Sequence, residues 1–478
     1  MSYVISGYEP KRAFEIFEDI CAIPHGSGNE SGVADYIAAF AEKNGLYCKR
    51  DEVGNVFLRK NATSGYENKP ALMLQGHMDM VCEKNADSDH DFERDGLKLR
   101  VIDGYLWATD TTLGADNGIA VAMMLALLET RAHPTLECLF TVEEETGLAG
   151  AQGFDCSEVT AKRMINLDSE EEWQITAGCA GGCRTEIDVE NSLCGVPCGS
   201  EAIAVSVTGL SGGHSGAEIH LGKTNAIVAM ARLLGVASEN ADVRVSSING
   251  GGKDNAIARE CFATVVTDNA SAVKAAIVAE CERMRRELCE ADAGFTVTVT
   301  DAKADTCFGA DDSARLISLL TVVRTGVLGM SNHISGLVEY SRNAGIIVTS
   351  GNKVKITLSS RSSVEAQLDA SCRELDMLCG LADVKCRHYA RYPGWEYEPC
   401  SALREKYSSA YAALYGNRPQ VGVIHAGLEC GILSSKLCGM DIISVGPNMF
   451  DIHSPCEHLD LASCEHVWNT LLKVVTDK

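Results

Sequence analysis

The hydrophobic and polar positions of the chain follow one pattern near both ends and another in the middle. Near the ends, short continuous apolar runs alternate with longer segments, and these predict buried strands and helices. The apolar segment 118–128 predicts a buried helix, and Ser27 and Glu30 have the spacing of a capping box that opens a helix through Phe40. Strands alternating with helices are typical of a mostly parallel, doubly wound sheet. Predicted strands of this kind lie at 71–74, 136–142, 164–167 and 442–445, and a further helix at 401–415.

The middle of the chain, from Ala202 to about Tyr389, has strands in which apolar and polar residues alternate. This alternation is typical of an antiparallel sheet with one face in water. The first pattern resumes after Tyr392-Pro393-Gly394. We therefore predict an α/β fold. Both chain ends, 1–182 and 392–478, form a domain with a doubly wound, mostly parallel sheet, and an inserted α+β domain at 183–391 carries an antiparallel sheet.

The inserted domain is interpreted as an internal duplication. Its two halves, 202–300 and 312–390, are nearly equal in length, and each predicts a helix, a hairpin, a second helix and a strand in that order. The predicted helices lie at 225–234, 272–288, 313–328 and 364–381, the hairpins at 244–268 and 337–360, and the closing strands at 295–300 and 384–389.

Composition narrows the class of protein. The 478 residues are 46% hydrophobic and 23% charged, which is ordinary for a globular protein. There are 66 acidic against 42 basic residues, a net charge of −24, and no long basic run, so nucleic acid and anionic membranes are not expected partners. No apolar stretch reaches the ~18 residues of a membrane span, and the first residues do not resemble a secretory signal. The 21 scattered cysteines are typical of free thiols, which favours a cytoplasmic protein.

Histidines and carboxylates stand where the predicted strands of the end domain finish. Carboxyl ends of parallel strands meet at one edge of a sheet, so we expect these side chains to converge. Nitrogen and oxygen donors of this kind suit Zn²⁺, and there are enough of them for two ions. The residues are His77 and Asp79, the triplet Glu143–Glu145, Asp168 and His453, together with Asp116 on the loop before the buried helix.

Each of these residues also has an ordinary interpretation when it is taken alone. His77 with Asp79 could be a surface ion pair, and the acidic triplet a solvated turn. Asp168 could cap a turn, and His453 could be a loop histidine with satisfied hydrogen bonds. Their conjunction at the ends of successive strands favours the metal site.

Other patterns point to competing chemistry. Gly209–Gly213 matches the G-x-S-x-G signature of a nucleophile elbow, and we keep a serine hydrolase using Ser211 as a distant alternative, although no helix follows directly. The glycines before Lys253 lack the Ser or Thr of a phosphate-binding loop. Two C-x₃-C pairs are compatible with a structural zinc, and the role of the segment 179–198 stays open; the cysteines are Cys179, Cys183, Cys194 and Cys198.

Taken together, the motifs resemble the co-catalytic metallopeptidase family that includes glutamate carboxypeptidase, aminoacylase and carnosinase. Segments 211–225 and 424–431 resemble its aminoacyl-histidine dipeptidase branch (Xaa-His or cytosol non-specific dipeptidase). The resemblance spans nearly the whole chain. Its motifs occur in order as Ser27-Gly28-Asn29-Glu30, Gly76-His77-Met78-Asp79, Gly114-Ala115-Asp116-Asn117-Gly118, Glu144-Glu145-Thr146-Gly147, Asn166-Leu167-Asp168-Ser169-Glu170, Gly212-Gly213-His214-Ser215-Gly216 and His453-Ser454-Pro455.

The resemblance implies a role for each matching position. His77 and Asp168 would be terminal ligands of one zinc ion and Glu145 and His453 of the other, with Asp116 bridging both. The family's glycine two residues after the ligand, here Gly147, sets the frame of the acidic triplet. The other implied roles are a general base at Glu144, a carboxylate behind His77 at Asp79, an oxyanion-stabilising histidine at His214, and a grip on the substrate's C-terminal carboxylate by Asn255, Arg361 and Gly427.

The function implied by the resemblance is a cytoplasmic dipeptidase of broad specificity that uses two Zn²⁺ per chain, with Mn²⁺ or Co²⁺ as alternatives. Its substrates would be small peptides with a free C-terminus, including Xaa-His dipeptides such as β-alanyl-histidine. An N-acyl-amino-acid amidohydrolase or a tripeptidase of the same family is the nearer alternative, and a non-catalytic metal-binding protein a distant one. Whether the protein forms a homodimer stays open, and we expect His214 to complete the active site of its own chain.

Overall fold

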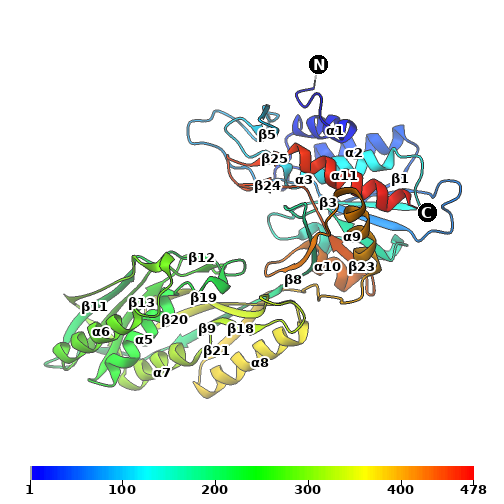
Figure 1. Cartoon of the computed structure of the whole chain (residues 1–478). Coiled ribbons are helices and arrows are strands. Elements are labelled where there is room, and N and C mark those ends of the chain that lie inside the picture. Colours follow the sequence, from blue (N-terminus) through cyan, green and yellow to red (C-terminus); the bar gives the residue numbers. More distant parts are fainter. Residues whose placement is uncertain (1–2, 478) are drawn as a thin grey trace. The chain divides into compact units, whose positions relative to one another are not determined.

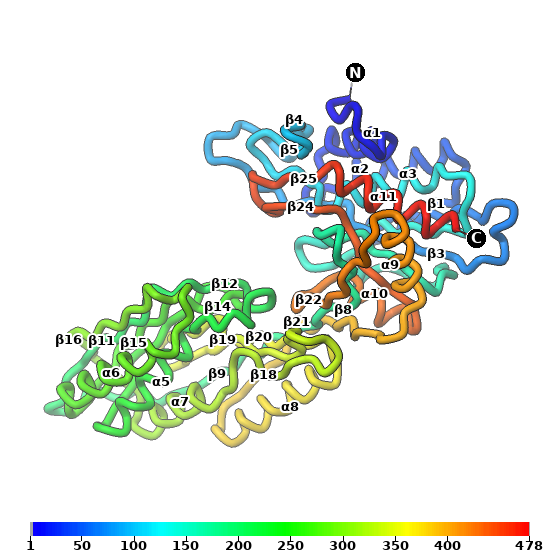
Figure 2. The backbone as a smooth tube through the Cα atoms, viewed as in Figure 1, coloured from blue at the N-terminus to red at the C-terminus, as the bar shows by residue number. Residues whose placement is uncertain are grey.

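The computed structural model describes residues 3–477 and divides into two compact units (Figure 1). The first unit contains the chain up to Cys179, Trp395–Val423, and the chain from Leu428 on. The second unit contains Ala180–Gly394 and the short segment Ile424–Gly427. Figure 2 follows this by colour, because early (blue to cyan) and late (orange to red) parts of the chain form the first unit, and green to yellow parts form the second.

The first unit is built on an eight-stranded sheet in the order β1-β2-β6-β3-β7-β23-β8-β22. The neighbours β6, β3, β7 and β23 are parallel, whereas β1, β2 and β8 pair antiparallel at the flanks. Every residue of β3 and β6 is buried, as expected of central strands in an α/β sheet. The bounds are β1 (Tyr47–Arg50), β2 (Val56–Lys60), β3 (Leu72–His77), β6 (Leu136–Thr141), β7 (Arg163–Asn166), β8 (Gln174–Cys179), β22 (Gln420–Ile424) and β23 (Asp441–Ser444).

Helices complete the core of the first unit. α3 (Ala115–Leu128) packs between α1 (Lys11–Cys21) and β3, and every one of its residues except Asp116 is buried, as its uniformly apolar sequence predicts. The other helices are α2 (Ser31–Lys43), α4 (Ala149–Gly153), α9 (Ala402–Tyr415), α10 (Glu429–Lys436) and α11 (Leu461–Thr476), with a 3-10 turn at Cys156–Glu158.

The predicted capping box is wrong. α2 begins at Ser31 with Glu30 at its N-cap position, and neither Ser27 nor Glu30 makes a side-chain hydrogen bond that caps it. The Ser27 hydroxyl donates to Asp79 instead, and the Glu30 carboxylate accepts from the backbone N–H of Glu143. A tertiary contact therefore takes the Ser27 hydroxyl, and the Glu30 carboxylate is shared between Glu143 and the backbone N–H of Gly28, which donates to it at 2.9 Å.

A small sheet in the order β24-β25-β5-β4 lies beside this core in the first unit. Its strands are β4 (Leu99–Ile102), β5 (Tyr105–Ala108), β24 (Met449–Phe450) and β25 (His458–Asp460). The connection between β24 and β25 carries His453, so the hairpin fixes both ends of the loop on which this histidine stands.

The second unit contains an antiparallel sheet in the order β16-β11-β15-β13-β19-β20-β9-β21, with β18 on β19. In β11, Ile203, Val205 and Val207 are buried and the residues between them are not, as their alternating sequence predicts. Helices lie along one face of this sheet (Figure 1). The bounds are β9 (Gly181–Glu190), β11 (Glu201–Thr208), β13 (Val243–Gly250), β15 (Cys261–Thr267), β16 (Thr296–Ala302), β18 (Gly326–Met330), β19 (Val338–Ser350), β20 (Lys353–Ser362), β21 (Lys385–Tyr392), α5 (Ala226–Ser238), α6 (Ala270–Met284), α7 (Ala310–Val322) and α8 (Glu365–Leu381). The α/β fold with a mostly parallel sheet and a separate antiparallel domain is thereby confirmed.

Two halves of this sheet have the same plan. One half follows the chain as α5, β13, β15, α6 and β16, and the other as α7, β19, β20, α8 and β21. From the junction of β13 with β19, where Gly250 pairs with Ile347, the strand order outward is β13-β15-β11-β16 on one side and β19-β20-β9-β21 on the other. One detail differs from the prediction, because α7 ends at Val322 and residues predicted as helix form β18.

The remaining short elements of the second unit are the paired β10 (Leu193–Gly195) and β17 (Thr306–Phe308), the paired β12 (Gly213–His214) and β14 (Ala256–Ile257), and 3-10 turns at Ile219–Leu221 and Glu290–Asp292. All 21 cysteines of the chain are free thiols. Among residues 3–477, no helix is both long enough and apolar enough to cross a membrane.

Candidate metal centre

The predicted metal ligands come from five separate segments of the first unit. β3 ends at His77, the turn after β6 carries Glu145, and Asp168 follows β7. Asp116 stands at the start of α3, and His453 lies between β24 and β25. The structure brings these five side chains together at the carboxyl edge of the parallel strands, where ligands bind in open α/β sheets.

Asp116 stands between the two histidines. Its Oδ1 lies 3.1 Å from Nε2 of His77, and its Oδ2 lies 3.2 Å from Nε2 of His453. Each histidine also meets a carboxylate of its own: Asp168 Oδ1 is 3.4 Å from His77 Nε2, and Glu145 Oε1 is 2.9 Å from His453 Nε2. The five side chains thus form two groups of donors that share one aspartate.

The donor atoms suit divalent metal ions such as zinc. His77 Nδ1 lies 3.0 Å from the backbone oxygen of Asp79 and 3.3 Å from its Oδ1, so the ring hydrogen belongs on Nδ1. That tautomer leaves the Nε2 lone pair free to bind a metal, and a carboxylate behind the ring raises its basicity. Imidazole nitrogens and carboxylate oxygens are the ligands of many zinc sites.

Buried acidic groups crowd around these donors. Burial, followed by the neighbouring charges of Asp116 and Asp168, raises the pKa of Glu170 to about 7. Burial is also the main cause that raises the pKa of Glu144 and, to about 7, that of Glu429. Ionised carboxylates so close together repel one another, and a bound cation relieves that repulsion.

Asp79 organises the centre from behind. Its carboxylate accepts hydrogen bonds from the Ser27 hydroxyl at 2.7 Å and from the backbone N–H groups of Glu144 and Glu145 at 3.0 and 3.2 Å. The same carboxylate orients His77. One side chain therefore fixes both a histidine and the turn that presents two glutamates.

Glu457 is a residue of this centre that the sequence did not reveal. Its carboxylate is 2% exposed and accepts from the backbone N–H groups of Leu113 at 2.7 Å, Gly114 at 3.1 Å and Ala115 at 2.9 Å. It therefore holds the loop that leads into Asp116. No local pattern distinguishes Glu457, whose only signal is its position four residues after His453.

Glu429 is a second such residue. Its Oε2 accepts from Gln75 at 2.5 Å and from the Thr141 hydroxyl at 2.7 Å, so it ties β3 and β6 together beneath the centre. It stands in the segment 424–431 that carried the family resemblance, but no role followed from that.

The other predicted residues lie in the second unit, where His214 and Arg361 are neighbours. A Cβ on Gly216 would lie 3.1 Å from His214 Cε1 and 3.3 Å from Arg361 Nε, so the two side chains meet at this glycine. His214 Nδ1 accepts from the backbone N–H of Ala217 at 3.0 Å, which places the ring hydrogen on Nε2. Arg361 Nη1 donates to the Tyr392 hydroxyl at 3.0 Å, while its buried Nε has no partner among the described residues.

Gly427 and Asn255 lie near the pair formed by His214 and Arg361. A Cβ on Gly427 would lie 2.9 Å from a ring carbon of Tyr392, so only glycine fits against this tyrosine. The backbone oxygen of Asn255 accepts from Ser215 N, next to His214, at 2.8 Å. The second unit thus gathers an imidazole N–H donor and a buried guanidinium.

Neither the G-x-S-x-G motif nor the two C-x₃-C pairs form the site that their sequence suggested. Ser211 donates its hydroxyl to Asp292 at 2.7 Å, and within residues 3–477 no hydrogen bond to a histidine is found for it. The four cysteines of the C-x₃-C pairs do not lie together either. Cys194 stands opposite Cys307 across β10 and β17, and no metal-type group among the described residues unites the four.

Comparison with known proteins identifies the family. Residues 73–477 match the sequence profile described as Peptidase family M20/M25/M40. The chain belongs to this family. This M20/M25/M40 peptidase is therefore a hydrolase of the metallopeptidase class, which uses divalent metal ions, and the resemblance drawn from its sequence motifs is confirmed.

Individual relatives cover the whole chain. The cytosol non-specific dipeptidase of Escherichia coli (strain K12) is 37% identical over 478 residues, 99% of both chains. The crystal structure of aminoacylhistidine dipeptidase from Vibrio alginolyticus has a TM-score of 0.93 at 35% identity, over 99% of this chain and 98% of that one. Aminopeptidase PepT from Bacillus cereus shares the fold, with a TM-score of 0.58 at 15% identity over 98% of both chains.

Proposed function

We propose that this peptidase is a cytoplasmic dipeptidase of broad specificity that holds two Zn²⁺ ions per chain, which Mn²⁺ or Co²⁺ can replace. Its substrates are small peptides with a free C-terminus, including Xaa-His dipeptides such as β-alanyl-histidine. The observation that carries the proposal is the position of Asp116, whose two oxygens face Nε2 of His77 and of His453 at 3.1 and 3.2 Å. The similarity to dipeptidases over 99% of the chain supports the substrate class.

The metal ions would be held by the five clustered side chains. His77 and Asp168 would hold one ion and Glu145 and His453 the other, and Asp116 would contribute to both. Bound there, such ions supply Lewis-acid activation of a water molecule and of the scissile carbonyl.

Glu144 acts as the general base and acid. It lies next to Glu145, and within residues 3–477 its carboxylate forms no ion pair with a histidine, while Asp79 fixes its backbone. Its carboxylate takes a proton from the attacking water and returns it to the leaving amine, a role that contributes about 10²–10⁴-fold in rate. Asp79 is a positioning residue, because it acts through His77 and through this turn.

The residues of the second unit recognise the substrate. His214 offers Nε2–H to the oxyanion that develops on the carbonyl, because its Nδ1 is engaged by Ala217. Arg361, with Asn255 and Gly427 beside it, holds the C-terminal carboxylate. A planar guanidinium binds a carboxylate through two hydrogen bonds, and its unpartnered Nε supports this assignment.

The active site is complete within one chain. The repeated plan of the second unit supports an internal duplication, in which the half 312–390 takes the place that the corresponding domain of a second chain would occupy in a dimer. His214 then serves its own chain whether or not the protein forms a homodimer.

A panel of peptides tests this function. Turnover of several dipeptides, β-alanyl-histidine among them, is measured on the purified protein, after chelation, and after Zn²⁺ is returned. We expect hydrolysis that chelation abolishes and zinc restores, with little turnover of N-acetylated amino acids or tripeptides. Preference for N-acetylated amino acids or for tripeptides would replace the dipeptidase assignment, and activity that survives chelation would refute the metal mechanism.

A further inference from the structure

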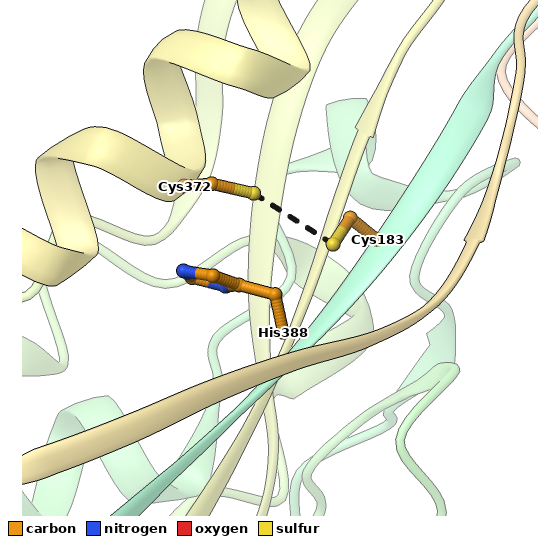
Figure 3. A group of neighbouring side chains, drawn as sticks. All are labelled: Cys183, Cys372 and His388. Carbon is orange, nitrogen blue, oxygen red and sulfur yellow. Dashed lines mark hydrogen bonds between the residues drawn. The ribbon is translucent and has the colours of Figure 1, made fainter.

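A group of thiols lies in the second unit between α8 and the sheet. On α8, Cys372, Asp376 and Cys379 occupy positions i, i+4 and i+7, which place them on one face of the helix. Cys183 on β9 and His388 on β21 face Cys372 from the sheet (Figure 3). This group differs from the C-x₃-C pairs of the sequence, because only Cys183 belongs to both.

We propose that Cys183, Cys372 and His388 form a separate metal site that binds a thiophilic cation of the Zn²⁺ type. Their donor atoms, two sulfurs and one imidazole nitrogen, all lie within 4.8 Å of one another. Thiolate and imidazole ligands select zinc and similar soft cations, whereas the centre in the first unit offers only nitrogen and oxygen.

The sulfur positions match those of a tetrahedral zinc site. Cys372 Sγ and Cys183 Sγ are 3.7 Å apart, and Figure 3 shows the Cys372 side chain directed from α8 toward Cys183. Two zinc–sulfur bonds of about 2.3 Å at a tetrahedral angle separate their sulfurs by about 3.8 Å. The two thiols therefore already have the spacing that a shared cation requires.

A carboxylate fixes the tautomer of His388 and so determines which ring nitrogen can bind a cation. Its Nε2 lies 3.1 Å from Asp376 Oδ1, so Nε2 carries the ring hydrogen and donates it. The lone pair then belongs to Nδ1, which accepts from the Thr185 hydroxyl at 2.8 Å and can exchange that rotatable partner for a cation. A carboxylate behind a ligating histidine is the usual supporting contact of protein metal sites.

A neighbouring triad of Asp376, Cys386 and His388 competes for the same histidine. It has one sulfur rather than two, and its aspartate is exposed. In the proposed site Cys183 is 2% exposed while Cys372 and His388 are partly exposed, so a cation can reach the site from solvent. Two thiolates bind a soft cation better than one, which favours Cys183 and Cys372.

Cobalt absorption tests the site on the full-length protein. After chelation and under a phosphine reductant, Co²⁺ is added while near-ultraviolet absorption is followed. Sulfur-to-cobalt charge transfer reports only a thiolate site, because the donors of the catalytic centre include no sulfur. We expect a band that saturates at one equivalent beyond the two that the catalytic centre takes, and that Zn²⁺ removes.

Substitutions locate the band. Cys372→Ser and His388→Gln should each lose most of it, while Cys386→Ser and the exposed Cys400→Ser, a matched control, should keep it. Retained peptidase activity shows that each variant is folded. A wild-type protein without the band, a band that persists in Cys372→Ser, or one that disappears in Cys386→Ser would each overturn the proposal.

Discussion

Glu457→Gln tests whether the loop before Asp116 is held in place by one buried carboxylate. In the wild type, Oε2 accepts from Leu113 and Gly114, and Oε1 accepts from Ala115, at 2.7, 3.1 and 2.9 Å. Glutamine keeps only one acceptor oxygen, so its NH₂ group must face at least one backbone N–H donor. One or two charge-assisted bonds are lost, each worth about 1.5–3 kcal/mol.

That loss should appear in metal binding, because the loop leads into Asp116, the residue that we propose binds both ions. About 1.4 kcal/mol corresponds to a tenfold change in an equilibrium constant. Part of the lost free energy lowers the stability of the whole protein rather than metal affinity. Substituting a residue that supports a metal ligand typically lowers metal affinity by about 10–100-fold. We therefore expect the zinc concentration for half-maximal activity to rise by about 10–100-fold.

Zinc-dependent activity of chelated and reloaded protein measures this directly. At saturating zinc the variant should recover most of its kcat, because Glu457 contacts none of the reacting atoms. Glu465→Gln, at an exposed position of α11, is the matched control and should behave as wild type. Unchanged zinc dependence in a folded Glu457→Gln protein would refute the reasoning.

Four further predictions concern the proposed catalytic and substrate-binding residues and the rejected nucleophile Ser211. Glu144→Gln should retain the zinc content of the wild type by elemental analysis but lose about 10²–10⁴-fold in kcat; an active variant would exclude Glu144 as the base. His214→Ala should lose about 10²–10³-fold in kcat, and mixing it with Glu144→Gln protein should restore nothing, since recovered activity would mean that chains share sites. Arg361→Lys should raise KM about tenfold or more, because a two-bond grip on the carboxylate is lost; an unchanged KM would place the carboxylate elsewhere. Ser211→Ala should lower stability by about 0.5–1.5 kcal/mol in denaturant titrations through its lost bond to Asp292 and leave kcat unchanged, whereas loss of activity in a folded protein would revive the serine hydrolase.

The convergence of the candidate metal ligands could be predicted from the sequence, because the order and direction of the strands determine where their ends lie. His77 and Asp168 each follow an apolar run, and parallel strands bring the ends of such runs to one edge. The bridging position of Asp116 came from the family resemblance, and the structure places its two oxygens between the two histidines.

What could not be predicted depends on contacts between distant segments. Ser27 has the local spacing of a helix cap, but its hydroxyl is used by Asp79, 52 positions along the chain. Glu457 acts on a loop more than 340 positions away, and no periodicity records such a contact. The partnership of Cys183 with Cys372 is of the same kind, since a helix and a strand from different parts of the second unit bring the sulfurs together.

Anomalous diffraction from zinc-loaded crystals tests the central claim most directly. We expect two zinc peaks in the first unit, about 3.5–4 Å apart as in other two-metal sites, with one oxygen of Asp116 on each. A single peak at this centre, or two peaks that Asp116 does not bridge, would contradict it.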